Sequence, residues 1–391
     1  MKNKNDEILK IVNDNTELFI KIRHHLHEYP ELSWKEFETS RYIKQFLDSW
    51  NIPYEKAGTN SIVATITGKT DKSKKKQKVV ALRGDIDALP IQEETGLEWQ
   101  SKIPGVMHAC GHDVHGTFML GAAKLLNEIK NQFEGIVKII FQESEETGGG
   151  AKKVMESDLL NDVDTIIALH DSQELDLGIF SLGYETMSAY GAGGHFIIET
   201  DGKINALIVA GELVSTVTAF FKERFSKEEQ IVMVPTVVKT EDTIDHIPSK
   251  VSVFYNSRTL NYDNEELMQT LLIKAAENTE ARFDCKIQTI LRTPGNVVNN
   301  DRYYTDFAVS VIKKYFGEVF VKFSQPVMSG EDFALYQKSI PGVYLHIGGA
   351  VNGDYHILYT SKTCVDDKIL PIGIEFLIRY VLEFFNTQKN I

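Results

Sequence analysis

Residues 79–90 read VVALRGDIDALP, and four later segments continue an alternation of strand-like and helix-like patterns: TFMLGAAKLLNEIK (117–130), GIVKIIFQES (135–144), AKKVMESDLL (151–160) and DTIIALHD (164–171). Short apolar runs are typical of buried strands, whereas apolar residues at three- and four-residue steps are typical of helices. This β-α-β-α-β order predicts an α/β fold with a largely parallel, mixed sheet flanked by helices. Such folds place ligands at the carboxyl ends of their strands, so we expect the chemistry there.

The rest of the chain predicts a second domain inserted into the first. A length of 391 residues already favours two domains. After Gly183 the pattern becomes strand, helix, two strands, helix and strand, which favours a compact α+β insert. We therefore predict a catalytic domain formed by residues 1–183 and 295–391, with the insert at 184–294. Amphipathic stretches over 5–27 and 34–50 predict helices at the start of the catalytic domain, and LPIGIEFLIRYVLEFF (370–385) predicts a helix at its end.

Composition excludes several classes of protein. The net charge of −13 gives no electrostatic support for nucleic-acid binding. The basic run Lys72–Lys78 lies between two strand-like segments, so we expect a solvated hairpin tip there. No apolar stretch is long enough to cross a membrane, and the charged first residues have no apolar signal segment. Three cysteines favour a reducing compartment over a disulfide framework, so we expect a cytoplasmic protein.

The strongest chemical signal is HACGHDVHG (108–116), which places His108, Cys110, His112, Asp113 and His115 in one loop before a helix. Thiolate and imidazole are good ligands for zinc and neighbouring divalent metals. A polar surface loop is the plainer alternative, but the density of these residues favours a metal site. Cys110 as a nucleophile with a nearby histidine base is a further alternative.

Two groups of carboxylates follow strand-like segments. Glu145 and Glu146 come after GIVKIIF; in an extended segment they would point to opposite sides, so that one could bind metal while the other acts as a base. Asp85 and Asp87 are two residues apart on one strand and would share a face, which calls for something cationic between them. The alternative is a solvated acidic turn for the glutamates and a pair of solvated aspartates at a frayed strand end for Asp85 and Asp87.

Six motifs then occur in one order, and together they resemble the metal-dependent aminoacylase and carboxypeptidase-type amidohydrolases. The motifs are RHHLHEYPELSWKEFET (23–39), RGDIDALPIQEETGL (83–97), MHACGHDVH (107–115), FQESEETGGGA (141–151), ALH (168–170) and MSGEDFA (328–334). The closest branch contains hippurate hydrolases, auxin-conjugate hydrolases and N-acetyldiaminopimelate deacetylases. The resemblance covers nearly the whole chain and implies two clustered divalent metals (zinc, manganese, cobalt or nickel), with an inserted lid that also forms homodimers or higher oligomers.

The resemblance also implies roles for individual residues. Glu145 would be the general base, and an aspartate of RGDIDALP, either Asp85 or Asp87, would orient a ligand or the base. Arg258 would hold a substrate carboxylate, and His195 would donate to the oxyanion in a partner's site. The metal ligands would be Cys110, His112, Glu146, His170 and His356.

The chain departs from the family pattern at several places. Glu143 stands where a proline is usual, and His356 lacks the proline and phenylalanine that normally follow it, which leaves His346 as a fallback ligand. The Gly-Gly-His loop that the family carries in its lid can be aligned with this chain in two ways. Only one of these alignments keeps His195 as the donor to the oxyanion. The sequence thus predicts a two-metal amidohydrolase that acts on N-acyl amino acids or small peptide-like substrates. The alternative is a catalytically silent, metal-containing binding protein with an altered lid.

Overall fold

The computed structural model describes residues 2–69, 77–226, 229–240, 245–291, 297–351, 353–354 and 357–387. The chain divides into two compact units. Unit 1 comprises residues 1–185, 299–325 and 332–391, and unit 2 comprises residues 186–298 and 326–331.

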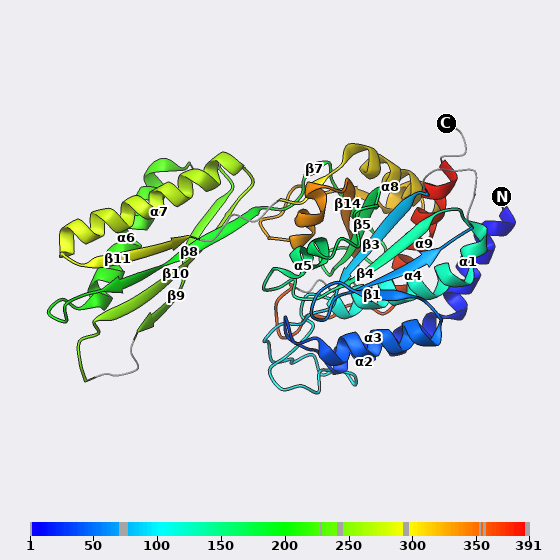
Figure 1. Ribbon diagram of the computed structural model, residues 1–391, viewed down its shortest axis with the longest axis horizontal. Helices are drawn as coiled ribbons and strands as arrows, with labels where there is room; N and C mark the ends of the chain where they lie inside the picture. The colour runs from blue at the N-terminus through cyan, green and yellow to red at the C-terminus, as the bar shows by residue number, and fades with distance from the viewer. Residues whose placement is uncertain are drawn as a thin grey trace. The chain divides into compact units, whose positions relative to one another are not determined.

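An eight-stranded mixed sheet forms the centre of unit 1, in the order β1-β2-β4-β3-β5-β14-β6-β13. Its four middle strands, β4, β3, β5 and β14, are mutually parallel (Figure 1). The α/β prediction with a largely parallel sheet is confirmed. The strands are β1 (Tyr54–Lys56), β2 (Ile62–Thr67), β3 (Val79–Asp85), β4 (Ile136–Gln142), β5 (Thr165–Ser172), β6 (Phe180–Leu182), β13 (Val321–Phe323) and β14 (Gly342–Gly348).

The middle strands are apolar because both faces of the sheet are covered. Every residue of β3 is buried, as a strand between two layers requires. Helices α4 and α9 pack against each other over the sheet, and their apolar side chains join one continuous core. The helices of unit 1 are α1 (Lys2–Asp14), α2 (Thr16–Glu28), α3 (Phe37–Ser49), α4 (His112–Glu128), α5 (Gly150–Glu156), α8 (Arg302–Tyr315) and α9 (Ile369–Asn386), with short 3-10 turns at Lys130–Gln132, Glu318–Phe320 and Asp332–Lys338.

Two local predictions are wrong. The helix expected over residues 5–27 is two helices, because Asn15 stands between α1 and α2 and its side chain donates to the carbonyl oxygen of Ile11, 2.8 Å away. The hairpin expected around the basic run does not form, because β4 lies between β2 and β3 and pairs with both. Residues 70–76 of that region lie outside the described residues.

Unit 2 is an antiparallel four-stranded sheet in the order β11-β8-β10-β9, with helices α6 and α7 together on one face (Figure 1). The helix-covered face holds Phe196, Val251 and Val253, whereas Phe254 and Arg258 lie on the opposite face. The elements are β8 (Tyr190–Glu199), α6 (Ala206–Arg224), β9 (Ile231–Thr240), β10 (Lys250–Thr259), α7 (Tyr262–Phe283) and β11 (Lys286–Leu291). Two short strands, β7 (Glu185–Thr186) and β12 (Asn299–Asn300), pair with each other.

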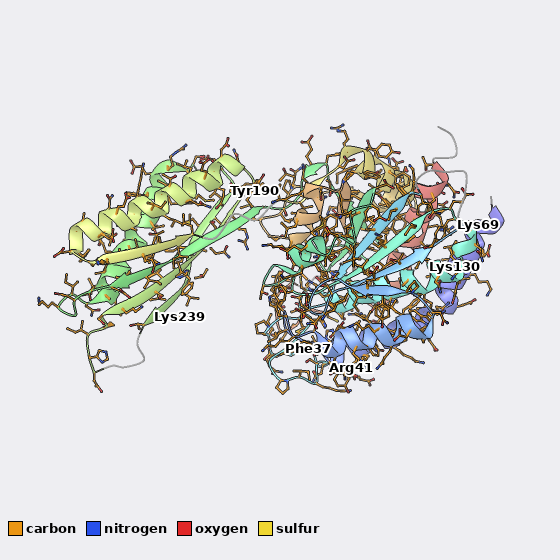
Figure 2. The ribbon with its side chains drawn as sticks, in the orientation of Figure 1. Phe37, Arg41, Lys69, Lys130, Tyr190 and Lys239 are labelled. Atoms are coloured by element: carbon orange, nitrogen blue, oxygen red, sulfur yellow. The ribbon has the colours of Figure 1, made fainter. Side chains whose placement is uncertain are left out.

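Strand β9 forms an edge of this sheet and is exposed along most of its length. Figure 2 marks its far end with Lys239, and marks the start of β8 with Tyr190. Four valines of β9 are more than a third exposed, namely Val232, Val234, Val237 and Val238.

None of the helices in the described part of the chain is both long enough and apolar enough to span a membrane.

Candidate metal centre

Three neighbouring parallel strands carry candidate residues to one edge of the sheet. Asp85 is the last residue of β3, Glu145 and Glu146 follow β4, and His170 lies near the end of β5. Because β4, β3 and β5 run in the same direction, their carboxyl ends meet.

The loop before α4 adds Cys110 and His112 to the same edge. Gly111 caps α4 with a left-handed φ of 77°, and a Cβ there would collide with the carboxylate of Asp171. Glycine is therefore required between the two candidate ligands. It lets the loop turn directly against the end of β5 and start the helix with His112.

The candidate ligands form two groups that share His112. Ligand atoms of Cys110, His112 and His170 all lie within 4.8 Å of one another, and so do those of His112, Glu145 and Glu146. Cys110 Sγ is 3.6 Å from His170 Nε2. Thiolate, imidazole and carboxylate groups at such separations are typical of sites for zinc and neighbouring divalent ions.

Backbone carbonyls fix the orientation of both histidines. The Nδ1 of His112 lies 2.9 Å from the carbonyl oxygen of Asp87, and the Nδ1 of His170 lies 2.6 Å from that of Asp171. A carbonyl oxygen only accepts, so each Nδ1 carries its proton and donates it. Each Nε2 then faces the cluster of candidate ligands. Hydrogen-bond partners that do not themselves touch the metal orient ligating histidines in this way.

Two buried polar atoms at the centre fit a bound cation. His112 Nε2 and Glu146 Oε1 are 3.8 Å apart, and neither has a hydrogen-bond partner among the described residues. A buried polar atom without a partner costs about 1–3 kcal/mol. A cation between these two atoms would satisfy both, so the donor set fits a divalent metal.

The electrostatics of the centre favour the same occupant. Burial lowers the pKa of His112, but Asp85, Cys110 and Asp87 together outweigh burial and raise it. Burial raises the pKa of Glu146 to about 7, against the opposing effect of His112. A cation between His112 Nε2 and Glu146 Oε1 would favour the neutral imidazole and the ionised carboxylate, which are the forms that bind metals.

Asp85 and Asp87 do not share one strand face, because β3 ends at Asp85. Asp87 lies beside both candidate ligands: its Oδ1 is 3.2 Å from His112 Nδ1, and its Oδ2 accepts from the backbone N–H of Glu146 at 3.0 Å. Asp85 instead accepts from Arg83 at 2.6 Å, which provides the cationic partner expected from the sequence. The geometry therefore gives Asp87 the contact that would orient His112.

Glu145 and Glu146 lie in a turn and not in an extended segment, so the opposite-face argument is wrong. The chain turns because Ser144 adopts a left-handed φ of 51° and the N–H of Gly148 donates to the carbonyl oxygen of Glu145. Glu143 braces this turn by accepting from the backbone N–H groups of Thr59 and Asn60 at 2.8 and 2.7 Å.

Asp332, from the motif MSGEDFA, connects the turn to the sheet. Its backbone N–H lies 3.4 Å from Glu145 Oε1, and its carboxylate accepts from Arg83 and Gln142 at 2.7 and 2.9 Å. The sequence pattern of this motif did not by itself indicate a role for Asp332.

His115 could join two further groups of ligand type, but its ring is already satisfied. Its Nδ1 is 2.5 Å from Asp85 and its Nε2 is 2.8 Å from Asp171. Burial lowers the pKa of His115, but these two carboxylates outweigh it and raise the pKa to about 9. The backbone N–H of Asp171 also donates to His115 Nε2 at 3.0 Å. Both ring nitrogens therefore already have protein partners, which leaves the groups around His112 as the candidate centre.

Asp171 and Tyr359 also touch this centre and were not predicted from the sequence. Asp171 follows His170 directly, and its place at a strand end was a usable signal. Tyr359 Oη lies 3.3 Å from Cys110 Sγ, and no motif pointed to it.

The two remaining described candidates, His195 and Arg258, belong to unit 2. The ring of His195 stacks on Phe254 with centroids 4.9 Å apart, on the open face that also carries Arg258. Gly193-Gly194-His195 lies inside strand β8 and does not form the loop that the family pattern implies. The loop that follows the strand, residues 200–205, contains no histidine that could take its place. Arg258 Nη1 donates to Asn256 Oδ1 at 2.6 Å.

The fifth predicted metal ligand, His356, lies outside the described residues. The fallback ligand His346 pairs with His170 across β14 and β5 but belongs to none of the ligand groups formed by the described residues. A separate cavity of about 690 Å³ is lined by residues such as Tyr29, which follows α2, and Arg41 and Tyr42 of α3, and by none of the candidate residues.

Comparison with known proteins identifies relatives over almost the whole chain. Residues 81–383 match the model of peptidase family M20/M25/M40. N-acetylcysteine deacetylase from Bacillus subtilis (strain 168) is 31% identical over 384 residues, which span 95% of this chain and 97% of the relative. IAA-amino acid hydrolase ILR1-like 5 from Arabidopsis thaliana is 33% identical over 395 residues, which span 94% of this chain and 88% of the relative.

A solved structure of an M20-family protein is also similar to this chain. The YXEP protein of Bacillus subtilis, described as a dinuclear metal-binding peptidase from the M20 family, superposes with a TM-score of 0.80 at 28% identity. The match covers 96% of this chain and 99% of that one. The resemblance drawn from the sequence motifs is confirmed.

Proposed function

Because the chain belongs to peptidase family M20/M25/M40, whose members hydrolyse amide bonds, we propose that it is a two-metal amidohydrolase of N-acyl amino acids or related small peptide-like substrates. The observation that carries this proposal is the pair of unpartnered buried atoms, His112 Nε2 and Glu146 Oε1, with the thiol of Cys110 and the imidazole of His170 grouped around the same His112.

We assign the metal ligands to Cys110, His112, Glu146, His170 and His356. Bound there, two divalent ions would polarise the scissile carbonyl and make water more acidic. Asp87 would hold His112 through Nδ1 and the turn of Glu146 through its backbone N–H, so that both ligands keep their orientation. The mixture of thiol, imidazole and carboxylate leaves zinc, manganese, cobalt and nickel as candidates.

Glu145 is assigned as the general base. Its ligand atoms lie in the same group as those of His112 and Glu146, and the backbone N–H of Asp332 faces its Oε1. Glu145 would take a proton from the attacking water and then deliver it to the nitrogen of the leaving amine. The water oxygen adds to the carbonyl carbon, and the carbon–nitrogen bond breaks as that proton arrives.

Arg258 is assigned to the carboxylate of the amino-acid portion of the substrate. Replacing it with alanine should raise KM for an N-acyl amino acid by about 10–100-fold with a small change in kcat, because a hydrogen-bonded charge contributes about 1.5–3 kcal/mol. The same replacement should leave KM unchanged for the matching N-acyl amino acid amide, which has no carboxylate.

Arg282 provides the matched control for that experiment, since it lies on α7 of the same unit and pairs with Glu212. Arg282→Ala should behave as the unchanged protein with both substrates. An equal rise of KM for acid and amide in Arg258→Ala would contradict carboxylate recognition.

We further propose a homodimer formed through unit 2, with His195 donating to the oxyanion of a partner's substrate. An exposed edge strand with unpaired backbone groups is a template for pairing with another chain, and β9 is such an edge with four exposed valines. Val237→Lys should therefore yield monomers in light scattering coupled to size-exclusion chromatography. Phe37→Lys, at an even more exposed apolar position of unit 1, should stay dimeric; dimers in both variants would move the interface away from β9.

Two rivals have specific tests. In a cysteine hydrolase, Cys110 would need to ionise without a metal, yet burial raises the pKa of its thiol well above the ordinary value. If the protein were a cysteine hydrolase, thiol alkylation would abolish its activity and chelators would leave the activity intact. A silent binding protein would hold metal and release no amine from any substrate.

The three cysteines are unpaired, and on that ground we infer that the protein acts in a reducing compartment such as the cytoplasm.

The test of the proposed function is amine release from a panel of N-acetyl, N-benzoyl and N-indoleacetyl amino acids by metal-stripped protein. Hydrolysis that returns with Mn²⁺ or Zn²⁺ is the expected result, and the preferred member of the panel identifies the acyl group. Bound metal without amine release from any member would favour the silent binder.

A further inference from the structure

Tyr359 contacts two consecutive residues of the loop that carries a proposed metal ligand. Its Oη lies 3.3 Å from Cys110 Sγ, in hydrogen-bond contact. Its backbone N–H donates to the carbonyl oxygen of Ala109 at 3.0 Å. The phenol therefore reaches the sulfur from a residue whose main chain is already fixed to the same loop.

The segment around Tyr359 is built to keep the residue in this position. Tyr359 adopts a left-handed backbone with a φ of 62°, which bulky residues adopt only when their surroundings enforce it. Thr360 and Thr363 both donate through Oγ1 to the carbonyl oxygen of Ile357 at 3.0 Å, and close the segment into a compact turn.

A second attachment fixes the turn to the body of unit 1. The backbone N–H of Glu94 donates to the carbonyl oxygen of Ser361 at 2.8 Å, and Ser361 Oγ donates to the Glu94 carboxylate at 2.6 Å. Thr363 is buried beneath the turn. Contacts on both sides of Tyr359 thus hold its ring at the sulfur.

We propose that Tyr359 is a positioning residue for Cys110, whose phenol donates a hydrogen bond to the Cys110 thiolate and so fixes the sulfur as a ligand. The inference rests on the proposed function, because it takes Cys110 to be a metal ligand. A thiol can donate to a phenol, but a thiolate only accepts, so the phenol is the donor once the sulfur is ionised. Hydrogen bonding around a ligating sulfur changes how much electron density that sulfur gives to the metal.

The test is the absorption spectrum and metal affinity of the Co²⁺-loaded protein, compared with its Tyr359→Phe variant. Removal of the phenol leaves the thiolate more electron-rich, so the thiolate-to-cobalt charge-transfer band should move to longer wavelength. Co²⁺ affinity, measured by competition with a chelator, should fall by about 10–100-fold, the range for loss of a hydrogen-bonding partner of a metal ligand. Tyr184→Phe is the matched control, because that phenol donates to Asp306 at 2.7 Å on the surface of unit 1.

A double-mutant comparison assigns the effect to the sulfur. In a Cys110→Ser background, Tyr359→Phe should change Co²⁺ affinity by less than about twofold, because the two side chains act through one contact. Should the phenylalanine variant fail to fold, Tyr359→Asn removes the phenol and suits the left-handed backbone. The band should shift in that variant too.

The outcomes separate this inference from the proposed function. Absence of any charge-transfer band in the unchanged protein would show that Cys110 is not a ligand, which overturns the ligand assignment itself. A band that is present but identical in Tyr359→Phe, with equal affinity, would overturn the role of Tyr359 alone.

Discussion

Glu145→Gln should lower kcat by about 10²–10⁴-fold while the protein keeps its metal, because general acid–base groups contribute that much and glutamine cannot accept the proton. The amide has nearly the same shape as the carboxyl group, so the turn and its contact with Asp332 should remain. The measurement is kcat for the preferred substrate together with metal content by elemental analysis.

Glu134→Gln is a suitable control for this variant, since Glu134 precedes β4 and takes no part in the ligand groups of the described residues. It should retain full activity. If Glu145→Gln kept the turnover of the unchanged protein, the base would have to be another residue. Loss of metal along with activity would instead make Glu145 a ligand.

His112→Ala should bind metal more than about 100-fold more weakly and lose hydrolysis with it. Loss of a mere outer partner already costs 10–100-fold in affinity, and His112 belongs to both proposed ligand groups. Metal content after dialysis and recovery of activity with excess metal are the measurements.

His24→Ala is the matched control, because that histidine lies on α2, contacts Asp367 at 2.8 Å and belongs to no ligand group of the described chain. It should bind metal as the unchanged protein does. Full metal content in His112→Ala would show that His112 is not a metal ligand. It would also contradict the proposal that His112 belongs to both ligand groups.

The fold was largely predictable because buried parallel strands have a simple signature. The apolar runs that became β3, β4 and β5 are short and alternate with helical segments, which favours buried parallel strands. Their carboxyl ends then bring Asp85, Glu146 and His170 together by topology alone. The site's main residues could thus be located before any side chain was placed.

Strand pairing and turns were not predictable in the same way. The pairing of β4 between β2 and β3 is set by contacts between distant segments, and the apolar pattern of each strand is the same whichever neighbour it has. The turn at Glu145 depends on Thr59 and Asn60, far away in the sequence, which donate to Glu143. Tyr359 reaches Cys110 through a similarly non-local loop contact.

The most direct test of the two-metal hydrolase is titration of metal-stripped protein with Mn²⁺ or Zn²⁺, following bound metal and hydrolysis of an N-acyl amino acid together. We predict that activity is absent without metal and becomes saturated at two ions bound per chain. Hydrolysis that persists undiminished in the stripped protein would contradict the account.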